Sequence, residues 1–148
     1  MTIAELVVVI GIFVLLFAIG LTALVNSRTA KQLDVITDSI ASKLEEAKTN
    51  AMSGKNGANF GLAFSTTTYT YWSGASYNPA DTTNNVYTIP GSFIVSSSTI
   101  PGTYHAIRFA RITGTPDVTG SIIISNVSNA STSDTITIGT LGNITVIK

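Results

Sequence analysis

Glu5 is a carboxylate directly ahead of a long apolar segment. The chain opens with MTIAELVVVI, and residues 6–25 hold no charged side chain. A lone charge beside hydrocarbon is costly unless something neutralises it. The nearest cation in the same chain is Arg28, about 35 Å away along a straight helix. We therefore expect the counterion of Glu5 to be the α-amino group of Met1 in a second copy, because that group is mostly charged at neutral pH.

Such an ion pair would set the register between copies more than it would add strength. Breaking a buried pair costs about 3 to 5 kcal/mol, whereas making one is only weakly stabilising. The alternative for Glu5 is a place in the headgroup zone at the end of a membrane helix, where its charge costs little.

Other residues that could do chemistry are sparse. His105 is the only histidine, and the chain has no cysteine and no G-x-S-x-G elbow, so a nucleophile and base pair has little to build on. Asp81, Asp117 and Asp134 are distributed one per loop, without the closely spaced oxygen ligands of a Ca²⁺ loop. The sequence therefore predicts no catalytic residue, no metal site and no cofactor, and we do not expect an enzyme.

A nucleic-acid interface would need a basic patch with aromatic neighbours. The formal net charge is zero. The C-terminal two thirds offer these candidates: Lys55, Arg108, Arg111 and Lys148, with Tyr69, Tyr71, Trp72 and Tyr104. The same region also contains carboxylates, so its cations exceed its anions only slightly. We therefore expect the aromatic residues to pack within the sheet. Nucleic acid is not an expected partner, and DNA capture stays as an alternative.

The apolar segment, residues 6–25, has about the 20 residues that span a 30 Å hydrocarbon layer. A secretory signal peptide would need a basic region first, and no Lys or Arg precedes Leu6. The sequence therefore predicts a membrane-spanning helix. The missing basic flank also favours Met1 as the first residue of a processed chain.

The helical pattern continues after the apolar segment. Apolar residues recur at spacings of three and four at Leu33, Ile36, Ile40, Leu44, Ala47 and Ala51. No proline interrupts residues 1–53, and MSGKNG then supplies a glycine stop. We expect one helix of about 50 residues, about 80 Å long. Its weak points are expected at Gly11, Gly20 and Thr22, although glycines there would equally allow close packing of membrane helices.

From residue 59 onward the pattern is that of β-structure. Six to eight short strands are expected in NFGLAF, TTTYTYW, NVYTI, SFIVSS, YHAIRFARI, GSIIIS, DTITI and NITVIK, separated by turn-forming segments. Their tight spacing favours antiparallel pairing. The predicted fold class is α+β: the long N-terminal helix, apolar in its first half, packs on an antiparallel sheet. The predicted domains are an apolar helix (1–25), its amphipathic continuation (26–53) and a β-rich globular head (54–148).

The N-terminal segment MTIAELVVVIGIFVLLFAIGLTALVNS resembles the mature N-terminus of bacterial type IV pilins and pseudopilins. Glutamate at the fifth place, the length of the apolar run and the helical continuation all agree over residues 1–52. The C-terminal segments TGSIIIS and DTITIGTLGNITVIK are similar to the closing strands of the FimT and GspH-like pseudopilins. The resemblance implies the pilin fold.

The resemblance also implies a pathway of processing and assembly. A prepilin peptidase would cut before Met1, which is then N-methylated, and subunits would wait in the cytoplasmic membrane. Inner-membrane pilus assembly machinery would extrude them into a helical homo-oligomeric filament at the cell surface. Glu5 would pair with the neighbouring Met1, with Thr2 beside them. The expected filament core contains Leu6, Val9, Ile10, Phe13, Leu16 and Phe17.

The sequence departs from this family in two places. Many type IV pilins have a proline near Thr22, and many close a C-terminal loop with a disulfide that a chain without cysteine cannot form. The last strand should therefore be held by the sheet and by packing of Ile144, Val146 and Ile147. A major pilin is the favoured function, and a minor pilin, a secretion pseudopilin or a membrane-anchored DNA- or ligand-binding protein are alternatives. Asn126, Asn129 and Asn143 lie in N-x-S/T sequons that could accept glycans.

Overall fold

The computed structural model describes residues 2–148, with side chains for all of these except residues 18–24 and 26. The chain divides into two compact units, Met1–Gln32 and Leu33–Lys148. The helix α1 (Ile3–Met52) contributes to both units. The second unit also contains a short 3₁₀ helix and eight strands: η1 (Lys55–Gly57), β1 (Phe60–Phe64), β2 (Thr68–Ser73), β3 (Asn85–Thr88), β4 (Phe93–Ser98), β5 (Ile107–Phe109), β6 (Gly120–Asn126), β7 (Ser133–Ile138) and β8 (Ile144–Ile147).

The expected fold class is wrong with respect to the apolar helix. Described side chains in α1 cover residues 3–17, 25 and 27–52. No helical segment among these described residues is long and apolar enough to cross a membrane.

The predicted weak points of α1 fall mostly outside the described side chains. Gly20 and Thr22 belong to the stretch whose side chains are not described. Gly11 lies in the described part of the first unit, and no atom lies within 4 Å of the place where its side chain would be. This glycine is therefore not required by close packing within its own chain.

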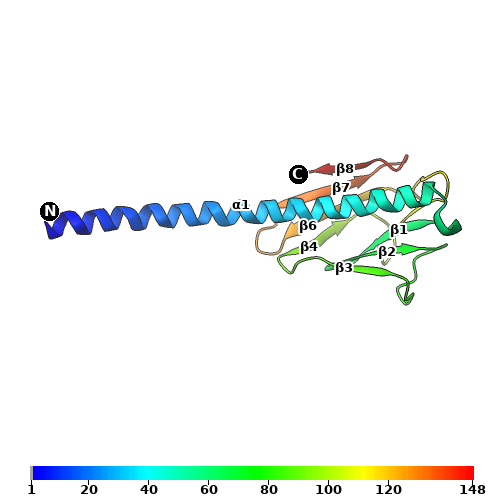
Figure 1. The fold of residues 1–148 in the computed structure, drawn as a ribbon, viewed down its shortest axis with the longest axis horizontal. Helices are drawn as coiled ribbons and strands as arrows, with labels where there is room; N and C mark the ends of the chain where they lie inside the picture. Colours follow the sequence, from blue (N-terminus) through cyan, green and yellow to red (C-terminus); the bar gives the residue numbers. More distant parts are fainter. Residues whose placement is uncertain (1) are drawn as a thin grey trace. The chain divides into compact units, whose positions relative to one another are not determined.

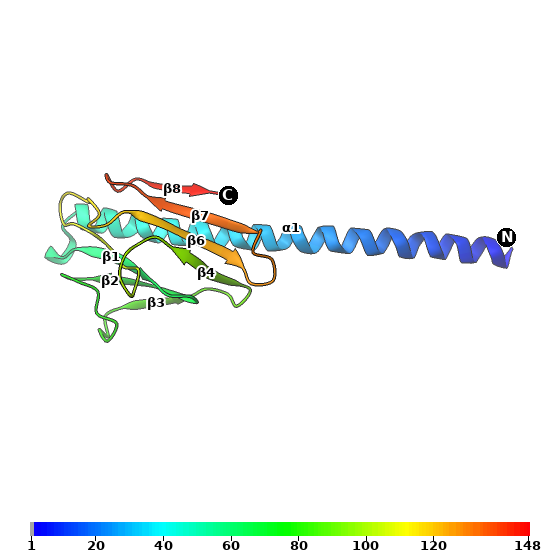
Figure 2. The same ribbon diagram turned by 180° about the vertical axis from the view of Figure 1, so that it is seen from behind.

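In the second unit, α1 lies along one face of the strands, in front of them in Figure 1 and behind them in Figure 2. The predicted apolar stripe is confirmed: Leu33, Ile40, Leu44, Ala47 and Ala51 are at most 2% exposed, and Ile36 packs against the same core. A period of 3.6 residues places these side chains on one side of the helix.

The expectation of one sheet is also wrong. All eight predicted segments form strands and all pair antiparallel, but they form two four-stranded sheets, in the orders β3-β2-β1-β5 and β4-β6-β7-β8. The chain leaves the first sheet at Pro90, whose carbonyl accepts a hydrogen bond from the backbone N–H of Phe93 at the start of β4. It returns for β5 and leaves again before β6. Pairing therefore joins strands that are not neighbours in the sequence.

The last strand is only partly held as expected. In β8, Ile144 and Val146 are half-buried and pack against the core. Ile147 is 60% exposed, so its predicted packing is wrong. The reason is the two-residue period of a strand, which sends alternate side chains to opposite faces.

The outer face of the first sheet, opposite the helix, depends on Gly61. The register pairs Gly61 of β1 with Trp72 of β2 on one side and with Arg108 of β5 on the other. A Cβ atom at Gly61 would lie 2.9 Å from the Trp72 ring and 2.1 Å from the Ile107 carbonyl oxygen. The indole of Trp72 therefore occupies the space that this missing side chain leaves.

A second internal feature is a buried carboxyl group close to α1. Asp134 of β7 is 4% exposed and Thr37 of α1 is fully buried. Neither Asp134 Oδ2 nor Thr37 Oγ1 forms a hydrogen bond within the described part of the chain. Burial is the main cause that raises the pKa of Asp134, and the negative charges of Asp34 and Asp38 raise it further. The Thr37 hydroxyl and the positive charge of Lys148 act in the opposite direction.

We predict that Gly61→Ala destabilises the fold by about 1–3 kcal/mol, because the added Cβ overpacks a site closed by backbone. Chemical unfolding of the full chain, followed through its single tryptophan, Trp72, measures the effect. Gly91→Ala is the matched control, since nothing lies within 4 Å there, and it should change the stability by less than about 0.5 kcal/mol. Equal stabilities of the two variants would contradict the packing argument.

We also predict that Asp134→Asn stabilises the fold at pH 7. The folded-state pKa of Asp134 is raised, so the wild-type chain loses stability as the pH rises above about 4 and through that raised value. The neutral amide of the variant does not ionise, so the variant avoids this loss of stability. Near pH 3 the wild-type carboxyl is protonated, and the two chains should be equally stable. Urea unfolding at several pH values measures it.

Asp81→Asn is the control, because its effect on folding stability at neutral pH should have the opposite sign. Hydrogen bonds from Thr83 lower the pKa of Asp81, so its contribution is present at neutral pH and is lost as the pH falls through the lowered value. If Asp134→Asn and the wild-type chain had the same unfolding free energy at every pH, the proposed cost of burying the Asp134 carboxylate would be contradicted.

Candidate functional site

The first turn of α1 is closed by a reciprocal pair of contacts between Thr2 and Glu5. The Thr2 backbone N–H donates to Glu5 Oε2 at 2.8 Å, and the Glu5 backbone N–H donates to Thr2 Oγ1 at 3.3 Å. The Thr2 carbonyl accepts the first helical hydrogen bond, from the N–H of Leu6. This is a capping box, in which Thr2 is the N-cap and Glu5 the third helical residue.

The capping box gives Glu5 a partner that the sequence reasoning overlooked. The signal was present, because T-x-x-E directly before an apolar run is typical of a helix start. It satisfies hydrogen bonds and places a negative charge at the favourable end of the helix, but it supplies no cation. Glu5 Oε2 accepts from the Thr2 backbone N–H and, at 3.4 Å, from the Thr2 hydroxyl, whereas Oε1 makes no hydrogen bond within the described residues. Met1 lies outside the described residues, so its pairing with Glu5 of another copy stays a prediction.

The first unit presents apolar side chains on every side of the helix. The consecutive residues Val7, Val8, Val9 and Ile10 are 41–61% exposed. The six predicted filament-core residues are all exposed within the single chain, from 41% at Val9 to 68% at Phe17. A helix that is apolar all round belongs in a bundle core or in lipid. One flat partner surface could not cover it.

The cations of the second unit do not form the basic patch that the alternative of DNA capture would need. Arg108 Nε lies 3.5 Å from Asp117, and Lys148 Nζ lies 3.2 Å from both Asp34 and Asp38. The hydrogen bond to Asp38 and the contact with Asp34 raise the pKa of Lys148. Two of the four candidate cations are thus paired with carboxylates. Exposed ion pairs such as these add little stability, but they do cancel charge.

The aromatic candidates are equally poor platforms for a nucleic-acid strand. Tyr69 is 6% and Trp72 3% exposed, so neither offers a free ring face. The Tyr71 hydroxyl accepts a hydrogen bond from the Asn50 amide of α1 at 2.7 Å. Tyr104 is 49% exposed and is the most accessible of the four aromatic candidates. Their main role is packing.

The residues considered for catalysis or metal binding have local structural roles. His105 has a positive φ of 42°, and its Nδ1 lies 2.7 Å from the Ile100 carbonyl oxygen, which closes the loop before β5. Asp117 binds Arg108, and Asp81 binds the Thr83 amide and hydroxyl. Among the described residues, no three His, Asp or Glu side chains are grouped so that they could hold a metal ion.

The three sequons differ in accessibility. Asn126 is 7% exposed, and its side-chain oxygen accepts hydrogen bonds from the amides of Ser128 and Asn129. Asn129 and Asn143 are exposed. A modifying enzyme could therefore reach Asn129 and Asn143 in the folded chain, whereas Asn126 is held inside the turn after β6.

The chain was compared with protein-family models, curated proteins and solved structures, and none of them matches.

Proposed function

We propose that this chain is a structural subunit, the major pilin, of an extracellular type IV pilus-like filament. The observation that carries the proposal is the apolar surface of the first unit, residues 3–17, which is exposed on every side in a single copy. Burying apolar area is worth about 25 cal/mol per Å², so such a helix has a strong tendency to be surrounded. Sister helices in a filament core provide a cover of matching length and chemistry.

Glu5 supports the same proposal through its charge. The capping box holds the Glu5 carboxylate through Oε2 at the start of an apolar helix, without a cation in the described first turn. Within a bundle this charge requires a positive partner, and the α-amino group of Met1 from a neighbouring copy is the partner we propose. The apolar surface would then provide adhesion, and the ion pair would align one copy with the next.

The composition is consistent with close packing of many copies. Charged residues make up only 11% of the chain, and the formal net charge is zero. Copies of a weakly charged surface repel one another little. Before assembly, we propose that lipid of the cytoplasmic membrane covers the apolar surface of residues 3–17. Inner-membrane pilus assembly machinery and a prepilin peptidase would act on the chain at that stage.

The decisive prediction separates the charge of Glu5 from its cap. Glu5→Gln keeps a capping box, since glutamine serves equally well at this position, but it removes the counterion of the neighbouring amine. An unpaired charge in an apolar bundle costs about 3–5 kcal/mol, so we expect filaments to be lost or reduced at least a hundredfold. Electron microscopy and immunoblotting of sheared surface material measure the yield.

Thr2→Ala is the matched control, because it removes the cap and keeps the charge. It should cost about 1 kcal/mol, leave filaments in place and lower their thermal stability. Normal filaments from Glu5→Gln together with loss of assembly in Thr2→Ala would show that Glu5 acts only in the cap. Native filaments that contain only traces of this chain would instead indicate a minor subunit.

A further inference from the structure

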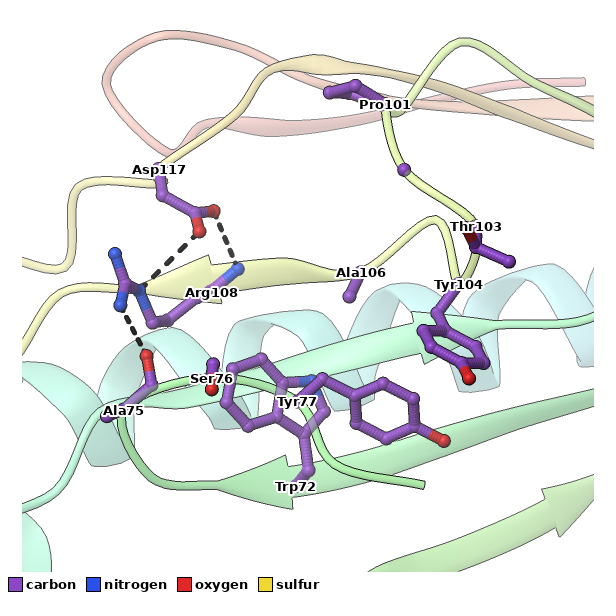
Figure 3. A pocket seen from close by; sticks show the side chains of 11 residues that line it. Trp72, Ala75, Ser76, Tyr77, Pro101, Thr103, Tyr104, Ala106, Arg108 and Asp117 are labelled. Carbon is purple, nitrogen blue, oxygen red and sulfur yellow. Dashed lines mark hydrogen bonds and ion pairs between the residues drawn. The ribbon is translucent and has the colours of Figure 1, made fainter. Parts of the chain in front are cut away.

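The outer face of the first sheet carries a pocket of about 290 Å³ (Figure 3). It lies between the loop that follows β2 and the loop that precedes β5. Its size is close to the lower end of the range for small-ligand sites. Figure 3 shows aromatic rings toward one end and the Arg108–Asp117 pair at the other. The pocket therefore offers an apolar wall and a polar wall to the same ligand.

The floor of the pocket follows from the strand register. Trp72, Gly61 and Arg108 lie side by side across β2, β1 and β5, and the indole occupies the space above Gly61. Trp72 is 97% buried by this arrangement, as its exposure is 3%. Its Nε1 is shielded from solvent and donates no hydrogen bond within the described residues. A buried donor without an acceptor is unusual, so the floor of the pocket holds an unused hydrogen-bond donor.

The aromatic wall is preorganised. The rings of Tyr77 and Tyr104 meet edge to face, with centroids 5.4 Å apart and planes at 74°. The Tyr104 carbonyl accepts a hydrogen bond from the Phe64 amide at 3.0 Å, and the His105 ring fixes the same loop at Ile100. Tyr104 nevertheless keeps 49% of its surface exposed. A ligand would find one free ring face on a backbone that is already held in place.

The polar wall carries no net charge. The Asp117 carboxylate accepts one hydrogen bond from the Arg108 backbone N–H at 2.9 Å and lies 3.5 Å from Arg108 Nε. Arg108 Nη1 donates to the Ala75 carbonyl. The pair still presents guanidinium donors and carboxylate acceptors side by side. Such a wall suits a ligand with several hydroxyl groups, each both donor and acceptor, better than an anion or a cation.

We propose that this pocket binds one neutral pyranose residue of a glycan. A pyranose has C–H groups on its faces, which fit the Tyr104 ring, and hydroxyls at its edge, which fit Arg108 and Asp117. The perpendicular rings of Tyr77 and Tyr104 leave no parallel slot for a flat base, whereas a puckered ring fits the corner between them. The inference does not depend on the filament proposal.

The single tryptophan of the chain reports directly on this floor. The full-length chain, in a detergent without a sugar headgroup, is titrated with methyl glycosides of glucose, galactose, mannose and N-acetylglucosamine up to about 100 mM while the Trp72 emission is recorded. We expect at least one to give a saturable change, with a dissociation constant of about 1–10 mM. Absence of a saturable change with all four overturns the proposal.

Variants and a charged ligand sharpen the test. Tyr104→Ala should weaken binding at least about tenfold, whereas Tyr87→Ala, in the same sheet but away from the pocket, should leave it unchanged. Methyl glucuronide, which carries a carboxylate in place of a hydroxymethyl group, should bind about tenfold more weakly than methyl glucoside. Asp117→Asn removes the repelling carboxylate, so it should bring the dissociation constants of the two glycosides closer together. Unchanged binding in Tyr104→Ala, or equal binding of the glucoside and the glucuronide, overturns the proposed site.

Discussion

Burial of the α1 stripe between Leu33 and Ala51 is the interaction on which the second unit depends. The stripe belongs to the same hydrophobic core as Leu62 and Phe109 of the first sheet and Ile124 and Ile136 of the second. Two sheets without a shared edge are joined because one helix covers both. Polar contacts flank the stripe: Asn50 donates to Tyr71 of the first sheet and Lys48 to the Gly142 carbonyl before β8. Without the stripe, each sheet would expose an apolar face.

The two units handle charge and apolar surface in opposite ways. In the second unit, the cations Arg108 and Lys148 are matched with carboxylates and the apolar side chains are mostly inside. In the first unit, apolar side chains are exposed all round, and the charge of Glu5 has hydrogen bonds without a cation among the described residues. The unsatisfied properties of the first unit are those that other copies can satisfy. This contrast is the physical basis of the proposed filament.

Some elements could be predicted because their signals are local. The spacing of Leu33, Ile40 and Leu44 indicates one buried helix face, and alternation between turn segments locates all eight strands. The capping box is also local, with Thr2 and Glu5 three residues apart, but the charge of Glu5 directed the reasoning away from its hydrogen bonds. The expected bilayer span is wrong for the described residues, among which no helical segment is long and apolar enough to cross a membrane.

The sequence by itself therefore determined the helix stripe, the strand positions and the apolar character of the N-terminal segment, since each depends on neighbours within a few residues. Only the tertiary structure decided that β4 pairs with β6 rather than with β3, that Lys148 meets Asp34 and Asp38, and that Trp72, Gly61 and Arg108 form one row. These contacts join residues far apart in the chain. Many pairings of short, similar strands satisfy the same alternation, and only packing of the whole core selects one of them.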